Sequence, residues 1–178
     1  PETGAHAIIV DLEDAVAPAA KTAAREVARG WLEARRAADP GHAGTRQARW
    51  LRINAIDTGL WREDLAAIMA GAPDGIVLPK TDGPDQVRLV SAELDALEQS
   101  HSLAPGSTRL LPLVSETAGA ALTIPAYVGQ SLPRLAGLTW GAEDLSAVLG
   151  ATRKRDAAGH WTDTFRFVRA QTLLAAHA

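Results

Sequence analysis

The sequence predicts an α/β fold built from parallel strands. Short apolar runs typical of buried strands alternate along its 178 residues with longer stretches whose apolar side chains fall at helical spacing. The apolar runs show little alternation with polar residues, as expected for a parallel sheet that is covered on both faces. Strands that alternate with helices at this spacing are typical of βα units.

Five apolar runs are predicted to be strands. The first is AIIVD, in which a run of aliphatic side chains leads directly into an acid. The next three are RWLRIN, GIVLPK and RLLPLVSE, and the last is LAGLTWG. The predicted strands are residues 7–11, 49–54, 75–80, 109–116 and 135–141.

Helical patterns follow each predicted strand. The first lies just after Pro18, and the third begins at Pro84, a residue that suits the first turn of a helix. The predicted helical segments are 24–32, 61–69, 84–97, the alanine-rich 117–128, 142–149 and 162–176, and DPGHAG at 39–44 is predicted to be a loop. Trp31 and Trp61 fall on apolar stripes and are predicted core residues, whereas Trp140 is expected to pack near the end of the last strand.

Composition narrows the possible functions. The formal net charge of −3 gives no strong field to attract nucleic acid or an anionic membrane. No apolar run reaches the ~20 residues that a membrane span needs, so neither partner is expected. The absence of cysteine excludes disulfides, thiolate metal sites and cysteine nucleophiles, and it fits a cytoplasmic location.

Polar side chains cluster where the predicted strands end. The C-terminal ends of parallel strands share one edge of a sheet, and in βα proteins that edge carries the active site. The side chains should therefore converge in space although they are far apart in sequence. They are Asp11, Glu13, Asp14, Arg52, Asn54, Lys80, Glu116, Glu143 and Asp144.

Several carboxylates that meet in one pocket cannot all stay ionised without raised pKa values or a nearby cation. Arg52 and Lys80 supply part of the compensating charge. A divalent ion is the natural remainder, and oxygen ligands without histidine or cysteine suit Mg²⁺, with Mn²⁺ as the alternative. The sequence has no H-E-x-x-H, G-x-S-x-G, Walker A or G-x-G-x-x-G motif.

Several segments together resemble a known family. IIVDLEDAV, LRIN, GIVLPK, SETAGA and LTWGAEDLSAVLGATR are similar to the citrate lyase beta subunit-like proteins of the HpcH/HpaI aldolase/citrate lyase family, in the same order and at the same strand ends. The similarity runs from about residue 7 to about residue 172. Each motif alone is weak evidence, but five in the right order are specific.

The resemblance implies a TIM (β/α)₈ barrel, of which this chain would hold about five βα units of eight. Residues 1–178 would form a single barrel domain that lacks the first strand and the last two strands of the family. The resemblance also implies a homo-oligomer, either a trimer or a hexamer.

The implied activity is that of a Mg²⁺-dependent carbon–carbon lyase. Such an enzyme cleaves or forms a 3-hydroxyacyl-CoA, such as citryl-CoA or malyl-CoA, through an enolate, with a 2-oxo acid on the metal. By resemblance Glu116 and Asp144 are the metal ligands, Arg52 binds the substrate carboxylate, and all three count as catalytic, with Glu116 also in contact with substrate. The supporting residues are Asp11, Glu13, Asp14 and Lys80.

Simpler roles remain open for these residues. Glu116 or Asp144 could each cap the helix that follows it, since carboxylates favour helix N-termini. Arg52 and Lys80 could only neutralise the neighbouring acids. The basic run 153–155 is expected to be a solvated loop, with contact to CoA phosphates as the alternative. For the whole chain, the alternatives are a CoA-independent 2-oxo acid aldolase and a non-catalytic assembly subunit.

Overall fold

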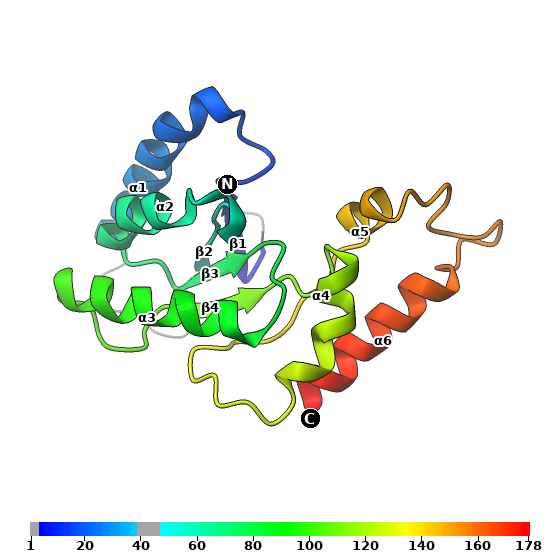
Figure 1. Ribbon diagram of the computed structural model, residues 1–178. Helices are drawn as coiled ribbons and strands as arrows, with labels where there is room; N and C mark the ends of the chain where they lie inside the picture. Colours follow the sequence, from blue (N-terminus) through cyan, green and yellow to red (C-terminus); the bar gives the residue numbers. More distant parts are fainter. Residues whose placement is uncertain (1–3, 39–46) are drawn as a thin grey trace.

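The computed structural model describes residues 4–38 and 47–178. Four parallel strands form one sheet in the order β1-β2-β3-β4 (Figure 1). They are β1 (Ala7–Asp11), β2 (Ala48–Arg52), β3 (Gly75–Leu78) and β4 (Arg109–Pro112). The α/β class and the consecutive parallel βα units of a partial barrel are confirmed. The predicted loop at 39–44 lies outside the described residues.

The predicted fifth strand is wrong as a continuous strand. Residues 135–141 run parallel to the edge of β4 but join that edge only through isolated bridges, at Leu110–Leu135 and Leu113–Thr139. Hydrogen bonds from Ala136 N to Leu110 O (2.8 Å) and from Thr139 N to Pro112 O (3.0 Å) flank the break. Pro112 has no N–H to donate, so the ladder cannot continue through it.

The helices agree with the predicted segments. They are α1 (Lys21–Ala38), α2 (Trp61–Ile68), α3 (Pro84–Ser100), α4 (Ala118–Thr123), α5 (Glu143–Val148) and α6 (Asp163–His177), with 3₁₀ turns at Pro18–Ala20, Ile56–Thr58, Met69–Gly71 and Ile124–Tyr127. The predicted segment 117–128 is divided, because its helical part ends where the 3₁₀ turn with Pro125 begins. The helix α6 packs against the 3₁₀ turn Ile124–Tyr127 that follows α4 (Figure 1).

The core lies between the sheet and the helices. Leu51, Ile76 and Leu110, one from each of three neighbouring strands, are completely buried. Trp61 at the start of α2 is buried as predicted, whereas Trp31 and Trp140 are partly buried and pack against the core. Across residues 4–38 and 47–178, no helix is long and apolar enough to cross a membrane.

Candidate active site

The C-terminal ends of β1 and β2 bring the first acids and a guanidinium together. The register places Asp11 opposite Arg52, and Arg52 Nε donates to Asp11 Oδ1 at 2.9 Å while Nη2 donates to Oδ2. Arg52 Nη1 also lies 3.0 Å from Glu13 Oε2. Burial raises the pKa of Asp11, but the hydrogen bond and charge of Arg52, together with hydrogen bonds from the Glu13 and Ala15 amides, outweigh it, so the pKa is lowered overall. Asp11 is therefore an anion that holds the guanidinium in place.

Glu13 is the central acid of this cluster, because it lies between two cations. It is only 4% exposed, and it contacts both Arg52 and the Lys80 ammonium. Lys80 Nζ lies 3.1 Å from the exposed Asp14 as well. Burial lowers the pKa of Lys80, but its hydrogen bonds to Glu13 and Asp14 raise it further, so Lys80 stays charged.

Lys80 also orients the next acid through its backbone. It follows β3 with a φ of 49°, in the left-handed region that a residue with a side chain rarely adopts. In this conformation Lys80 N donates to Glu116 Oε2 at 2.6 Å. The turn after β3 thus fixes Glu116, while the Lys80 side chain fixes Glu13.

Glu116 and Asp144 form a carboxyl pair. Glu116 is 3% exposed, and the Asp144 carboxyl, in the first turn of α5, is close enough to raise its pKa. Burial, followed by the interaction with the Asp144 carboxyl, raises the pKa of Glu116 to about 7. The hydrogen bond from the Lys80 amide acts in the opposite direction and only partly offsets this rise. Gly141 N donates to Ser115 Oγ at 2.9 Å, which joins the two segments just before the paired acids.

Neither acid caps the helix that follows it. The Thr117 hydroxyl caps α4 by accepting from Ala120 N at 3.0 Å. At α5 the capping position is Ala142, and no side chain makes a cap bond there. The close approach of Glu116 and Asp144 therefore has no explanation in helix capping.

The pair fits a divalent cation with oxygen ligands. Within the described ranges, 4–38 and 47–178, no group of three or more histidine, cysteine, aspartate or glutamate side chains is placed to share a metal ion. Mg²⁺ commonly takes only one or two protein carboxylates and fills its other positions with water and substrate. A buried carboxyl that is pushed toward its neutral form by a second one is a site where an added cation would restore both anions.

A buried network at Asn54 contains two residues that were not predicted, Arg25 and Asp64. Asp64 is completely buried and accepts hydrogen bonds from Asn54 N and Nδ2, both at 2.7 Å, and from Arg25 Nε at 2.7 Å. Asn54, predicted at the strand end, thus belongs to this network rather than to the acid cluster. Arg25 and Asp64 lie on helices with no motif around them, so the sequence carried no signal for the contact.

A comparison with known families decides what this arrangement belongs to. The profile described as HpcH/HpaI aldolase/citrate lyase matches residues 1–178. The chain belongs to this family. The family that the motifs at the strand ends predicted is therefore confirmed.

Individual relatives give the same result. The chain is 33% identical over 153 residues to the malyl-CoA/beta-methylmalyl-CoA/citramalyl-CoA lyase of Chloroflexus aurantiacus, covering 84% of this chain and 41% of that protein. It is 35% identical over 174 residues to a citrate lyase subunit beta-like protein of Mycobacterium tuberculosis, covering 98% and 53%. The chain thus spans about half the length of these relatives.

A solved structure is similar as well. It is the citrate lyase beta subunit of M. tuberculosis complexed with oxaloacetate and magnesium, which superposes with a TM-score of 0.69 at 34% identity. The match covers 96% of this chain and 64% of that one.

Proposed function

We propose that this protein is a Mg²⁺-dependent carbon–carbon lyase that cleaves or forms a 3-hydroxyacyl-CoA, such as citryl-CoA or malyl-CoA. The observation that carries the proposal is the pairing of the buried Glu116 with the partly exposed Asp144, beside the Arg52 cluster at the strand ends. The named activity of the Chloroflexus relative and the oxaloacetate and magnesium in the similar structure support the same chemistry.

Glu116 and Asp144 would hold the ion. When bound, Mg²⁺ would polarise a 2-oxo acid carbonyl and offset the negative charge of an enolate. The oxygens of this pair are hard donors, which suit Mg²⁺ and equally Mn²⁺. Only two protein ligands leave room for a bidentate 2-oxo acid.

Arg52 would bind the substrate carboxylate. Its Nε and Nη2 donate to Asp11, and a guanidinium has further N–H groups that can grip a second carboxylate. Asp11 and Glu13 keep the guanidinium oriented, and Lys80 with Asp14 holds Glu13 in turn. These supporting contacts would pre-organise the site for a planar anion.

Replacement of one ligand tests the metal assignment. We expect Asp144→Asn to abolish the rise in Tm that Mg²⁺ gives the unmodified chain, because a neutral amide binds a hard cation weakly. Glu143→Gln is the matched control, since Glu143 is 80% exposed, pairs with Lys154 and lies next in sequence. The assignment is wrong if Asp144→Asn retains the Mg²⁺-dependent shift that the control shows.

Substrate assays on the whole protein separate the alternatives. Cleavage of malyl-CoA or citryl-CoA that requires Mg²⁺ supports the proposed lyase. Turnover of pyruvate with an aldehyde, and of no thioester, identifies a CoA-independent aldolase instead. Binding of Mg²⁺ without any turnover identifies a non-catalytic assembly subunit.

A homo-oligomer, either a trimer or a hexamer in the cytoplasm, is part of the proposal. Phe167, Leu173 and Leu174 on α6 are each at least 60% exposed, and exposed apolar side chains of this kind favour a protein interface. The lack of cysteine suits a reducing compartment. Light scattering on the eluted peak of a sizing column gives the mass that decides between monomer, trimer and hexamer.

A further inference from the structure

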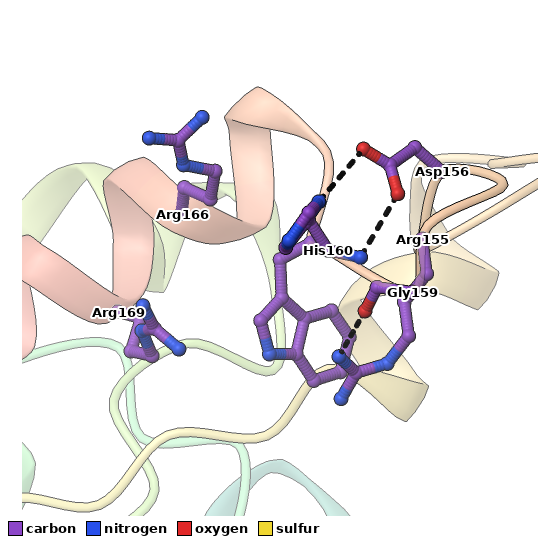
Figure 2. A pocket seen from close by; sticks show the side chains of 7 residues that line it. Arg155, Asp156, Gly159, His160, Arg166 and Arg169 are labelled. Carbon is purple, nitrogen blue, oxygen red and sulfur yellow. Dashed lines mark hydrogen bonds and ion pairs between the residues drawn. The ribbon is translucent and has the colours of Figure 1, made fainter.

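A basic cavity lies outside the acid cluster, between α6 and the 155–161 hairpin, the segment closed by the antiparallel bridge of Arg155 with Trp161. The cavity has a volume of about 740 Å³. Three arginines line it, namely Arg155, Arg166 and Arg169, together with His160 and Trp161. Figure 2 shows Arg166 and Arg169 on α6 and the other labelled residues on the hairpin.

The only carboxylate of the lining is already occupied by the hairpin. Asp156 Oδ1 accepts from Ala158 N and from His160 N, both at 2.9 Å, and Oδ2 lies 3.4 Å from His160 Nδ1 (Figure 2). Asp156 therefore shapes the turn rather than neutralising the arginines.

The arginines are held in different ways. Arg155 stacks on Trp161, with its guanidinium carbon 3.6 Å from the ring centroid, and its Nη1 donates to Gly159 O at 2.8 Å. Arg166 lies 3.6 Å from the exposed Asp163, a distance at which an ion pair contributes little. Arg169 makes no ion pair with any residue of the described ranges. The cavity thus has one pre-organised guanidinium and a second one without a counter-ion.

The wall of the cavity is connected to the candidate active site through packed aromatic rings. Trp161 packs edge-on against Trp140 at 5.3 Å between ring centroids, and against Phe165 at 5.8 Å. Trp140 immediately precedes Gly141, whose amide is bonded to Ser115 beside the acid pair. On the other side of the hairpin, Lys154 pairs with Glu143 of α5. The basic run 153–155 thus has Lys154 in a surface ion pair, while Arg153 and Arg155 are exposed as expected of a solvated loop.

We propose that this cavity binds a diphosphate group. Several guanidinium groups around one cavity are the arrangement that recognises phosphate oxygens, because each can donate two parallel hydrogen bonds. The cavity is larger than a single small anion requires, and its lining holds three arginines against one carboxylate. A diphosphate of this kind occurs at the nucleotide end of a CoA thioester and in a free nucleoside diphosphate. The assignment does not require the lyase activity proposed above.

Calorimetric titration with inorganic pyrophosphate, in EDTA, tests the site. We expect saturable binding that Arg169→Gln weakens about tenfold, as loss of one charge-assisted contact does. Arg169→Lys should recover only part of the affinity, because an ammonium keeps the positive charge but cannot donate two parallel hydrogen bonds as a guanidinium does. Arg29→Gln is the matched control, since Arg29 is a half-exposed arginine on α1 that lies 3.9 Å from Glu33 and is absent from the lining of the cavity.

Two further titrations separate the sources and the two proposals. CoA that competes with pyrophosphate, with the same loss in Arg169→Gln, identifies the nucleotide end of CoA, whereas competition by ADP alone identifies a free nucleotide. Asp144→Asn should bind pyrophosphate as the unmodified chain does. The pyrophosphate test therefore does not depend on whether Asp144 is a metal ligand. The proposal is overturned if pyrophosphate binding is not saturable, or if Arg169→Gln behaves like Arg29→Gln.

Discussion

The Glu116 carboxyl lies where the folded chain favours its neutral form. Burial and the neighbouring Asp144 raise its pKa to about 7, from an ordinary value of 4.5. Its folded-state pKa exceeds the unfolded one, so its contribution to stability is fully present below pH 4.5 and is lost as the pH rises through 7. Without a cation, the ionised acid therefore lowers the stability of the protein at neutral pH.

Glu116→Gln should consequently stabilise the metal-free chain in alkaline solution. The amide oxygen can still accept from Lys80 N, while the repulsion with Asp144 is gone. We expect a gain on the order of 2 kcal/mol at about pH 8 that disappears near pH 4. Urea unfolding in EDTA at both pH values measures it, and a loss of stability at about pH 8 would contradict this account of Glu116.

The residue scale also shows how far the sequence reached into the site. Asp11, Glu13, Arg52 and Lys80 were predicted from their positions after apolar runs, and the structure brings them into one cluster. The supporting contact of Asp64 with Asn54 and Arg25 was not predicted. Such a contact joins residues on separate elements, and no local pattern encodes it.

Among the elements, β2 and β3 are packed so closely at Gly75 that only a residue without a side chain fits there. Gly75 pairs with Trp50 in the register, and a Cβ added there would come within 2.3 Å of the indole ring. Gly30 in the exposed part of α1 is different, because a Cβ there meets nothing within 4 Å. An added side chain would therefore clash at Gly75 but not at Gly30.

Alanine at each position should change stability in opposite directions. We expect Gly75→Ala to destabilise by about 1–3 kcal/mol through overpacking against Trp50. Gly30→Ala should stabilise by about 0.5–1 kcal/mol, because alanine loses less backbone entropy in a helix. Urea denaturation of both variants gives the free energies of unfolding. An increase in that free energy for Gly75→Ala would contradict the expected clash with Trp50.

At the scale of the whole molecule, one buried ion pair fastens the segment beside β4 to the helical layer. Arg134 donates to Glu98, at the end of α3, through Nη1 (2.7 Å) and Nη2 (2.6 Å). The amides of Thr108 and Gly106 also donate to Glu98, at 2.8 and 2.7 Å. Burial raises the pKa of Glu98, but Arg134 and these amides outweigh it and lower the pKa to about 2.

The lowered pKa predicts part of the acid sensitivity of the fold. The stabilisation by Glu98 is present above its unfolded pKa of 4.5 and is lost as the pH falls through about 2. We expect Glu98→Gln to cost on the order of 3 kcal/mol at neutral pH and almost nothing near pH 2. Denaturant unfolding across this range measures the difference. Asp95→Asn is the control, since Asp95 contacts the same arginine but is 67% exposed, and a cost independent of pH would refute the linkage.

The sequence by itself determined the α/β class, the order of the elements, the polar residues at the strand ends and the family. These are properties of local pattern, because strand and helix periodicities and short motifs are written in neighbouring residues. Only the tertiary structure decided that residues 135–141 do not complete a strand, that Glu116 meets Asp144, and that arginines of α6 share a cavity with the hairpin. Each of these depends on a hydrogen-bond partner, a burial or a charge supplied by a distant segment, and those are fixed only when the chain is packed.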